Sequence, residues 1–143
     1  MIWLIAANTN SCRIFLYDKK SKKLTLIKEL NHAESKLKGT DLTSDGPGHY
    51  QTSNSARGAY SPREEAQENE IKFFSRQIAK ELDVGRKSNS FDKLILAVPP
   101  HMNGLIQQHM DSHLKDCITN NIKKDFTHLK EKDILESLIA NSL

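Results

Sequence analysis

The sequence is poor in the residues and patterns that mark secreted or membrane-spanning proteins. Its 143 residues include only two cysteines, four prolines, six glycines and one tryptophan. Cys12 and Cys117 are too few for a disulfide framework and lack metal-ligand spacing, so we expect free thiols in a reducing compartment. The apolar start, Met1–Asn8, is too short for a signal-peptide core and has no positive leader. No run is long enough to span a membrane, and we predict a cytoplasmic protein without membrane insertion.

A strong excess of one charge is also lacking. The 21 basic residues nearly balance the 18 acidic ones, and the resulting net charge of +3 does not by itself indicate a nucleic-acid partner. The clearest basic cluster lies between two apolar runs and consists of Lys19, Lys20, Lys22 and Lys23. We interpret it as a solvated hairpin tip, with phosphate binding as the less favoured alternative.

Motifs for common enzymatic chemistry are absent as well. The chain has no Gly-x-Ser-x-Gly element, phosphate loop or dinucleotide fingerprint, so we predict no cofactor. His109 and His113 are one helical turn apart, but Met110 stands where the zinc-protease pattern needs glutamate. Two ordinary surface histidines are favoured over a metal pair, and we predict no metal site.

The apolar residues occur in blocks whose spacing predicts the first half of the fold. Ile2–Ala7 is a continuous apolar run, typical of a strand buried on both faces. Cys12–Tyr17 and Leu24–Leu30 alternate in polarity, which predicts two further strands and an antiparallel meander. A helix then begins with a capping box of Ser61 and Glu64 around Pro62. Its core-facing stripe consists of Ile71, Phe74, Ile78 and Leu82, and the helix is predicted to stop at Gly85.

The second half alternates strands and helices. We predict strands at Phe91–Val98 and Cys117–Asp125 and helices at Met102–Leu114 and Leu129–Ile139, the last one capped by Asp125 or Thr127. The order β-β-β-α-β-α-β-α predicts an α/β fold, a five-stranded mixed sheet with helices on its faces, in ribonuclease-H-like topology. Residues 1–143 are expected to form a single domain.

A nuclease is nevertheless a poor interpretation. A ribonuclease-H enzyme needs carboxylates that converge on two metal ions, one of them from the first strand. The first strand here holds no acid and ends at Asn8.

Between about residues 31 and 60 the periodicity disappears, and turn-forming residues replace aliphatic ones. Because structureless segments of this length are usually functional or disordered, we expect a long mobile loop there.

Four blocks of sequence, taken together, resemble the family of proteins required for attachment to host cells. The resemblance runs along nearly the whole chain and rests on Trp3–Ala7 leading to Arg13-Ile14-Phe15, on Ser44–Gly48, on Leu94–Pro100 with Gly104, and on Lys124–Leu129. The chain departs from the family at Asn8, where an acid is usual, and at Gly46 and His49, where arginines are usual. The last block makes Asp125, Thr127 and His128 candidate motif residues.

That family is similar in turn to the middle domain of archaeal and eukaryotic class-one peptide release factors. In those factors a Gly-Gly-Gln loop tip positions a water against the peptidyl-tRNA ester. This chain has no Gly-Gly-Gln, but Gln51 follows Gly48 in the corresponding loop. The resemblance implies Gln51 as the candidate catalytic residue, with Arg57 as a phosphate contact. The implied binding loop consists of Gly46, Pro47, Gly48, His49 and Arg57.

Two functions follow as hypotheses. The first is a release-factor-like protein associated with the ribosome or tRNA, which binds without hydrolysis or, if it is an enzyme, resembles a peptidyl-tRNA hydrolase. This hypothesis rests on the resemblance and on the long loop. The alternative is a non-catalytic adaptor that binds a protein partner and affects host attachment indirectly.

Overall fold

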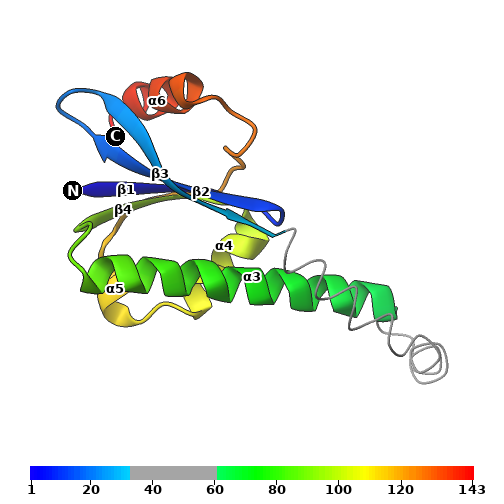
Figure 1. The fold of residues 1–143 in the computed structure, drawn as a ribbon. Coiled ribbons are helices and arrows are strands. Elements are labelled where there is room, and N and C mark those ends of the chain that lie inside the picture. Colours follow the sequence, from blue (N-terminus) through cyan, green and yellow to red (C-terminus); the bar gives the residue numbers. More distant parts are fainter. Residues whose placement is uncertain (33–60) are drawn as a thin grey trace.

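A computed structural model describes residues 1–32 and 61–143 of the protein. Its described elements are β1 (Ile2–Ala7), β2 (Ser11–Asp18), β3 (Lys23–Asn31), α3 (Pro62–Lys87), β4 (Lys93–Ala97), α4 (Pro100–Gln108), α5 (Ser112–Asp116), β5 (Ile118–Ile122) and α6 (Glu131–Ala140) (Figure 1). The five strands form one sheet in the order β3-β2-β1-β4-β5. Strand β2 pairs antiparallel with β1 and β3, whereas β4 pairs parallel with β1 and β5. The predicted α/β class, mixed sheet and meander are confirmed.

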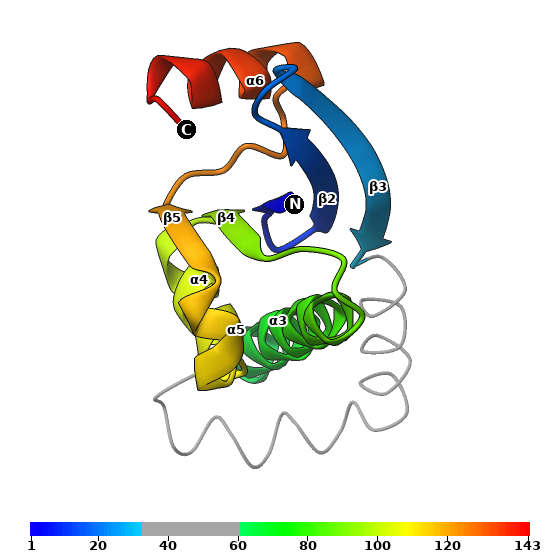
Figure 2. The ribbon, with the colours of Figure 1, turned by 90° about the vertical axis from the view of Figure 1, so that its left-hand side faces the viewer.

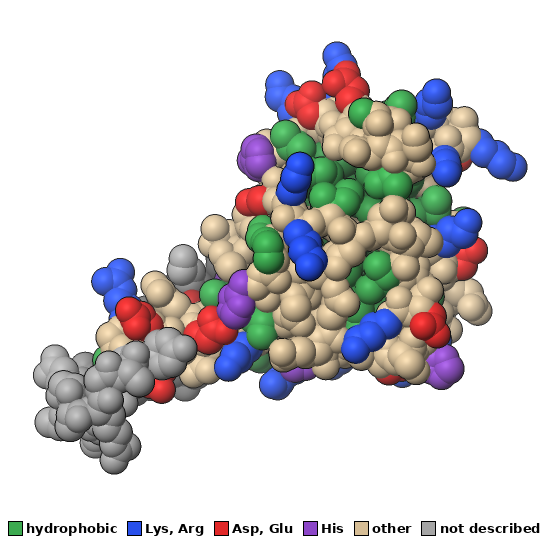
Figure 3. All heavy atoms as spheres, turned by 180° about the vertical axis from the view of Figure 1, so that it is seen from behind, with side chains coloured by type: hydrophobic (Ala, Val, Ile, Leu, Met, Phe, Trp, Pro, Cys, Tyr) green, Lys and Arg blue, Asp and Glu red, His purple; other side chains and the backbone are tan. Residues whose placement is uncertain are grey.

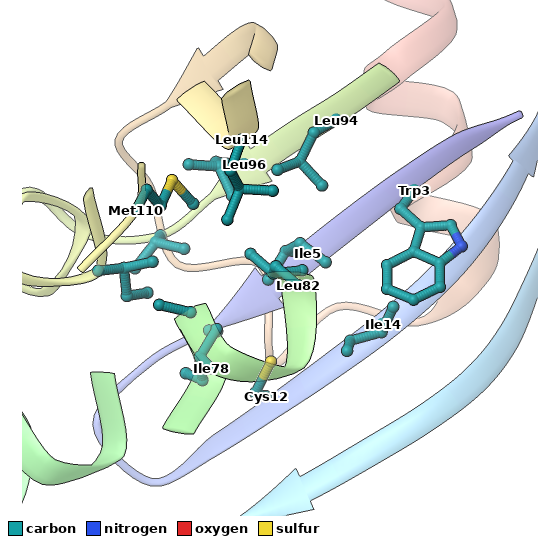
Figure 4. Close-up of a cluster of buried hydrophobic side chains, with 14 of the residues drawn as sticks. Trp3, Ile5, Cys12, Ile14, Ile78, Leu82, Leu94, Leu96, Met110 and Leu114 are labelled. Atoms are coloured by element: carbon teal, nitrogen blue, oxygen red, sulfur yellow. The ribbon is translucent and has the colours of Figure 1, made fainter. Parts of the chain in front are cut away.

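Helices cover both faces of this sheet, but unequally. Helices α3, α4 and α5 lie on one face and α6 lies on the other (Figure 2). Because β1 and β4 are central strands, their side chains are buried alternately in two separate cores, one on each face. The larger core lies under α3 and is shown in Figure 4; its labelled members are Trp3, Ile5, Cys12, Ile14, Ile78, Leu82, Leu94, Leu96, Met110 and Leu114.

Helix α3 begins as the sequence predicts but ends later. Ser61 accepts a hydrogen bond from the backbone N–H of Glu64, and the Glu64 side chain accepts one from the backbone of Ser61. The predicted stop at Gly85 is wrong, because the helix continues to Lys87. Gly85 is buried against the tryptophan instead: a Cβ placed there would lie 2.5 Å from the ring of Trp3. The absence of a side chain allows helix and sheet to pack closely.

The predicted helix Met102–Leu114 is in fact two helices, so the second half of the chain, which the structure describes throughout, contains one helix more than predicted. Helix α4 ends with His109 at its C-cap. Asp111 then caps α5, accepting a hydrogen bond from the N–H of Leu114 at 2.8 Å. His109 and His113 therefore do not share one helical face. Strands β4 and β5 are shorter than the predicted strands Phe91–Val98 and Cys117–Asp125. No helix among the described residues is long and apolar enough to cross a membrane.

Candidate functional site

The carboxyl ends of four strands meet at one edge of the sheet. Strands β1, β4 and β5 run in the same direction, and β3 does too because it is antiparallel to β2. This edge therefore carries Asn8 after β1, His32 after β3, Pro99 after β4 and the segment 123–130 after β5. In open α/β sheets, ligands bind outside the carboxyl ends of the strands, which makes this edge the place to examine.

Asn8, Asp125 and Thr127 form a hydrogen-bonded cluster at this edge. The Asn8 side-chain amide donates to Asp125 Oδ2 at 3.1 Å and to Thr127 Oγ1 at 2.8 Å. Its carbonyl oxygen accepts the backbone N–H groups of Asn10 and Ser11, which fixes the turn between β1 and β2. Asp125 Oδ1 in turn accepts the backbone N–H of Thr127 at 2.8 Å and its hydroxyl at 2.6 Å. We call Asn8, Asp125 and Thr127 the edge lock.

The edge lock explains the ionisation of its carboxylate. Partial burial raises the pKa of Asp125, but the hydrogen bonds from Thr127 and Asn8, with a smaller contribution from the charge of His128, outweigh it. The net effect holds the pKa of Asp125 below its ordinary value. His128 itself is exposed. The carboxylate is thus kept charged to serve as an acceptor within its own chain.

Arg13 fastens the same segment from β2. Its Nη2 donates to the backbone carbonyls of Thr127 at 3.1 Å and Leu129 at 2.8 Å, with a longer contact of 3.5 Å to Phe126. The guanidinium also lies over the ring of Phe15, with its carbon 5.2 Å from the ring centroid. Asn8, which follows β1, and Arg13 on β2 together hold the β5–α6 segment against the sheet.

The prediction that Asp125 or Thr127 caps the last helix is wrong. Helix α6 begins at Glu131, and its N-cap residue Lys130 makes no side-chain cap. Asp125 and Thr127 instead bind Asn8, which no local signal in the sequence indicates. Arg13 was also missed as a site residue. The one available hint is its position, a charged residue between apolar neighbours in an otherwise buried strand.

The other predicted site residues lie outside the part of the chain that the structure describes, so their roles remain predictions. They are Gln51, Gly46, Pro47, Gly48, His49 and Arg57. Within residues 1–32 and 61–143, no group of three or more His, Cys, Asp or Glu side chains could hold a metal ion.

Comparisons with known proteins agree with part of the resemblance noted from the sequence. The chain matches the family model described as "Protein required for attachment to host cells" over residues 3–138. No curated protein matches it. Among solved structures it is similar to the "pCBH ParM non-polymerisable quadruple mutant", with 15% identity and a TM-score of 0.46, over 99% of this chain and 47% of that one. The chain spans about half the length of that protein, and so weak a likeness says nothing about function. The family match covers nearly the whole chain: the protein belongs to the family of proteins required for attachment to host cells.

Proposed function

We propose that this chain is a non-catalytic adaptor with a ribonuclease-H-like sheet, which binds a protein partner and affects host attachment indirectly. For the topology, the support is the strand order β3-β2-β1-β4-β5, with an antiparallel meander followed by two parallel strands. For the absence of catalysis, the support is the edge lock. Asp125 and Arg13 bind their own chain at the edge where open α/β sheets usually bind ligands.

The observation that carries the adaptor role is apolar surface on β3 and α3. Leu26 and Ile27 on the edge strand β3 are 39% and 45% exposed, and Phe73 on α3 is 45% exposed. Phe73 also lines a groove between α3 and the end of β3, and exposed apolar side chains beside a groove are typical of surfaces that bind other proteins. We place the adaptor in the cytoplasm, because both cysteines are unbonded thiols.

A ribosome- or tRNA-associated factor is the second candidate, favoured by exposed lysines. Lys123, Lys124 and Lys130 flank the edge lock, and the β2–β3 hairpin adds Lys19 and Lys20. A nucleic-acid partner usually requires such charges to cluster on one face. On the face shown in Figure 3, however, basic side chains are dispersed among apolar, acidic and uncharged surface. This dispersion favours the adaptor.

One capture experiment separates the two candidates. The full chain, tagged, is used to retrieve partners from native-host extract, with and without nuclease and across a salt series. The adaptor role predicts a protein partner that stays bound after nuclease treatment. A partner lost with nuclease, or co-sedimentation with ribosomes that weakens steeply with salt, would contradict it and favour the second candidate. Under the adaptor role, Gln51→Ala leaves both the capture and any background peptidyl-tRNA cleavage unchanged.

A further inference from the structure

A second cleft lies at the amino ends of β1 and β4, on the opposite edge of the sheet from the edge lock. Its volume is about 460 Å³, and it is lined by Met1, Ile2, Lys19, Lys20, Asp92 and Lys93. The lining comes from three segments, namely the start of β1, the β2–β3 hairpin and the start of β4, which all lie at the left-hand end of the molecule in Figure 1. We call this site the amino-edge cleft. Because its segments are distant in sequence, only the folded chain forms it.

The strand register explains the apolar floor of this cleft. Ile2 of β1 pairs with Tyr17 of β2 on one side and with Lys93 of β4 on the other. Side chains of directly paired residues lie on the same face of a sheet, and Ile2 and Tyr17 both belong to the core under α6. Ile2 is only partly buried, and the side chain of Met1 is 72% exposed. The core under α6 therefore reaches the surface here as an apolar floor beside Lys93.

The rim of the amino-edge cleft is basic. Lys19, Lys20 and Lys93 are exposed, and none of them forms an ion pair with another residue of the ranges 1–32 and 61–143. Asp92, the acid of the described lining, lies 2.6 Å from the N-terminal ammonium group of Met1 and is compensated by it. Three cations thus remain without a counter-charge around the apolar floor.

The hairpin that carries two of these cations is ordered by its own hydrogen bonds. Asp18 Oδ1 accepts the backbone N–H groups of Lys20 at 3.0 Å and of Ser21 at 3.3 Å. These bonds, that of Ser21 above all, hold the pKa of Asp18 below its ordinary value, so its carboxylate serves the turn. Because the backbone of the turn is fixed in this way, little conformational entropy is lost there when a partner binds.

The combination of charge and apolar floor selects the occupant. An acidic segment complements the three lysines better than a basic or neutral one. A nucleic acid would also be attracted by the lysines, but it usually requires a whole basic face, and its phosphates gain nothing from the floor of Met1 and Ile2. A segment with both acidic and apolar side chains uses both parts of the cleft.

We propose that the amino-edge cleft binds a short acidic segment of a protein partner, with one apolar side chain of the segment on Met1 and Ile2. The acidic side chains of the segment face Lys19, Lys20 and Lys93. The inference rests on the proposed adaptor role and gives the adaptor a second contact, separate from the exposed apolar side chains of β3 and α3. A nucleic acid and an anionic lipid surface are the alternative occupants.

The test uses the full chain and a capped heptapeptide in which a central leucine is flanked by three glutamates on each side. Calorimetry compares its binding with that of two altered peptides. Lysine in place of glutamate should weaken binding by more than about tenfold, because like charges then face each other. Serine in place of leucine should weaken binding about fivefold, because the contact with the apolar floor is lost. A uridine decamer and phosphatidylserine vesicles test the alternative occupants.

Charge-matched variants of the protein locate the site. Lys20→Glu with Lys93→Glu is expected to weaken binding of the acidic peptide about tenfold, and this loss should shrink as salt is added. The control is Lys80→Glu with Lys132→Glu, which changes the net charge equally at exposed helical positions outside the cleft lining. It should change the affinity less than about twofold, because distant exposed charges are screened.

Four results would overturn the inference: no binding of the acidic peptide, equal effects of the cleft and control variants, an unchanged affinity with serine for leucine, or tighter binding of the uridine decamer or the vesicles. Failure of the cleft and failure of the adaptor role can be told apart. A nuclease-resistant partner that wild type and the cleft variant capture equally refutes the cleft alone. Peptide binding in the cleft without any nuclease-resistant protein partner refutes the adaptor role alone.

Discussion

Replacing Asp125 by alanine should destabilise the fold, because it removes the centre of the edge lock. The carboxylate accepts three hydrogen bonds, two from Thr127 at 2.8 and 2.6 Å and one from Asn8 at 3.1 Å. A hydrogen bond to a charged group contributes about 1.5–3 kcal/mol when isolated, but these three share one partly exposed acceptor and are not additive. We expect a loss of about 2 kcal/mol in the free energy of unfolding, or about 5 °C in Tm for a chain of this length.

The same substitution has a defined pH dependence. The folded-state pKa of Asp125 is depressed, so its stabilisation is complete above the unfolded value of about 3.9 and is lost as the pH falls through the folded pKa. The difference in Tm between wild type and Asp125→Ala should therefore stay constant near neutral pH and narrow below about pH 4. Calorimetric scans of both proteins across this range provide the measurement.

A double-mutant cycle supplies the control for this prediction. The losses in unfolding free energy caused by Asn8→Ala and Asp125→Ala should be less than additive by about 1 kcal/mol, because each substitution removes the same contact between the two side chains. Asp125→Ala with Ser137→Ala, on α6 and without a side-chain bond to the lock, should be additive. An unchanged Tm for Asp125→Ala, combined with loss of partner capture, would refute the structural role of the lock and make Asp125 a binding residue.

Three further predictions concern packing, capping and thiol reactivity. In chemical denaturation, Gly85→Ala should lower the free energy of unfolding by about 2–3 kcal/mol, because its methyl group meets Trp3. Gly104→Ala, with nothing within 4 Å of its Cβ, should raise the free energy of unfolding by about 0.5–1 kcal/mol. Equal effects of the two substitutions would contradict the close packing of Gly85 on Trp3. Ser61→Ala should cost about 1 kcal/mol through loss of the capping box, and no change in the denaturation midpoint would contradict that role. Under native conditions a thiol reagent should modify Cys117 and spare Cys12, because burial, with the charge of Glu81, raises the pKa of Cys12 to about 12. Rapid modification of both cysteines would contradict the burial of Cys12 in the core.

Local signals in the sequence predicted the elements well. The capping box at Ser61 and the stripe of Phe74, Ile78 and Leu82 depend on neighbours within a few residues, and the structure confirms them. The stop predicted at Gly85 failed because a glycine can serve close packing as well as helix termination, and only the position of Trp3 decides between them. Similarly, the break between His109 and Asp111 carries no proline or glycine.

Contacts between distant residues could not be predicted in the same way. Asn8 and Asp125 are separated by 117 positions, and their pairing depends on which strands lie side by side. The short polar segment 125–128 therefore has two reasonable interpretations from sequence, a helix cap or a tertiary contact. Phe73 likewise became a candidate binding residue only when the structure placed the middle of α3 beside the end of β3.

The most direct test of the account is the capture of partners by the tagged full chain from native-host extract, with and without nuclease. The adaptor role predicts a protein partner that stays bound after nuclease treatment and at raised salt. A partner that is lost with nuclease, or co-sedimentation with ribosomes that weakens steeply with salt, would contradict this role.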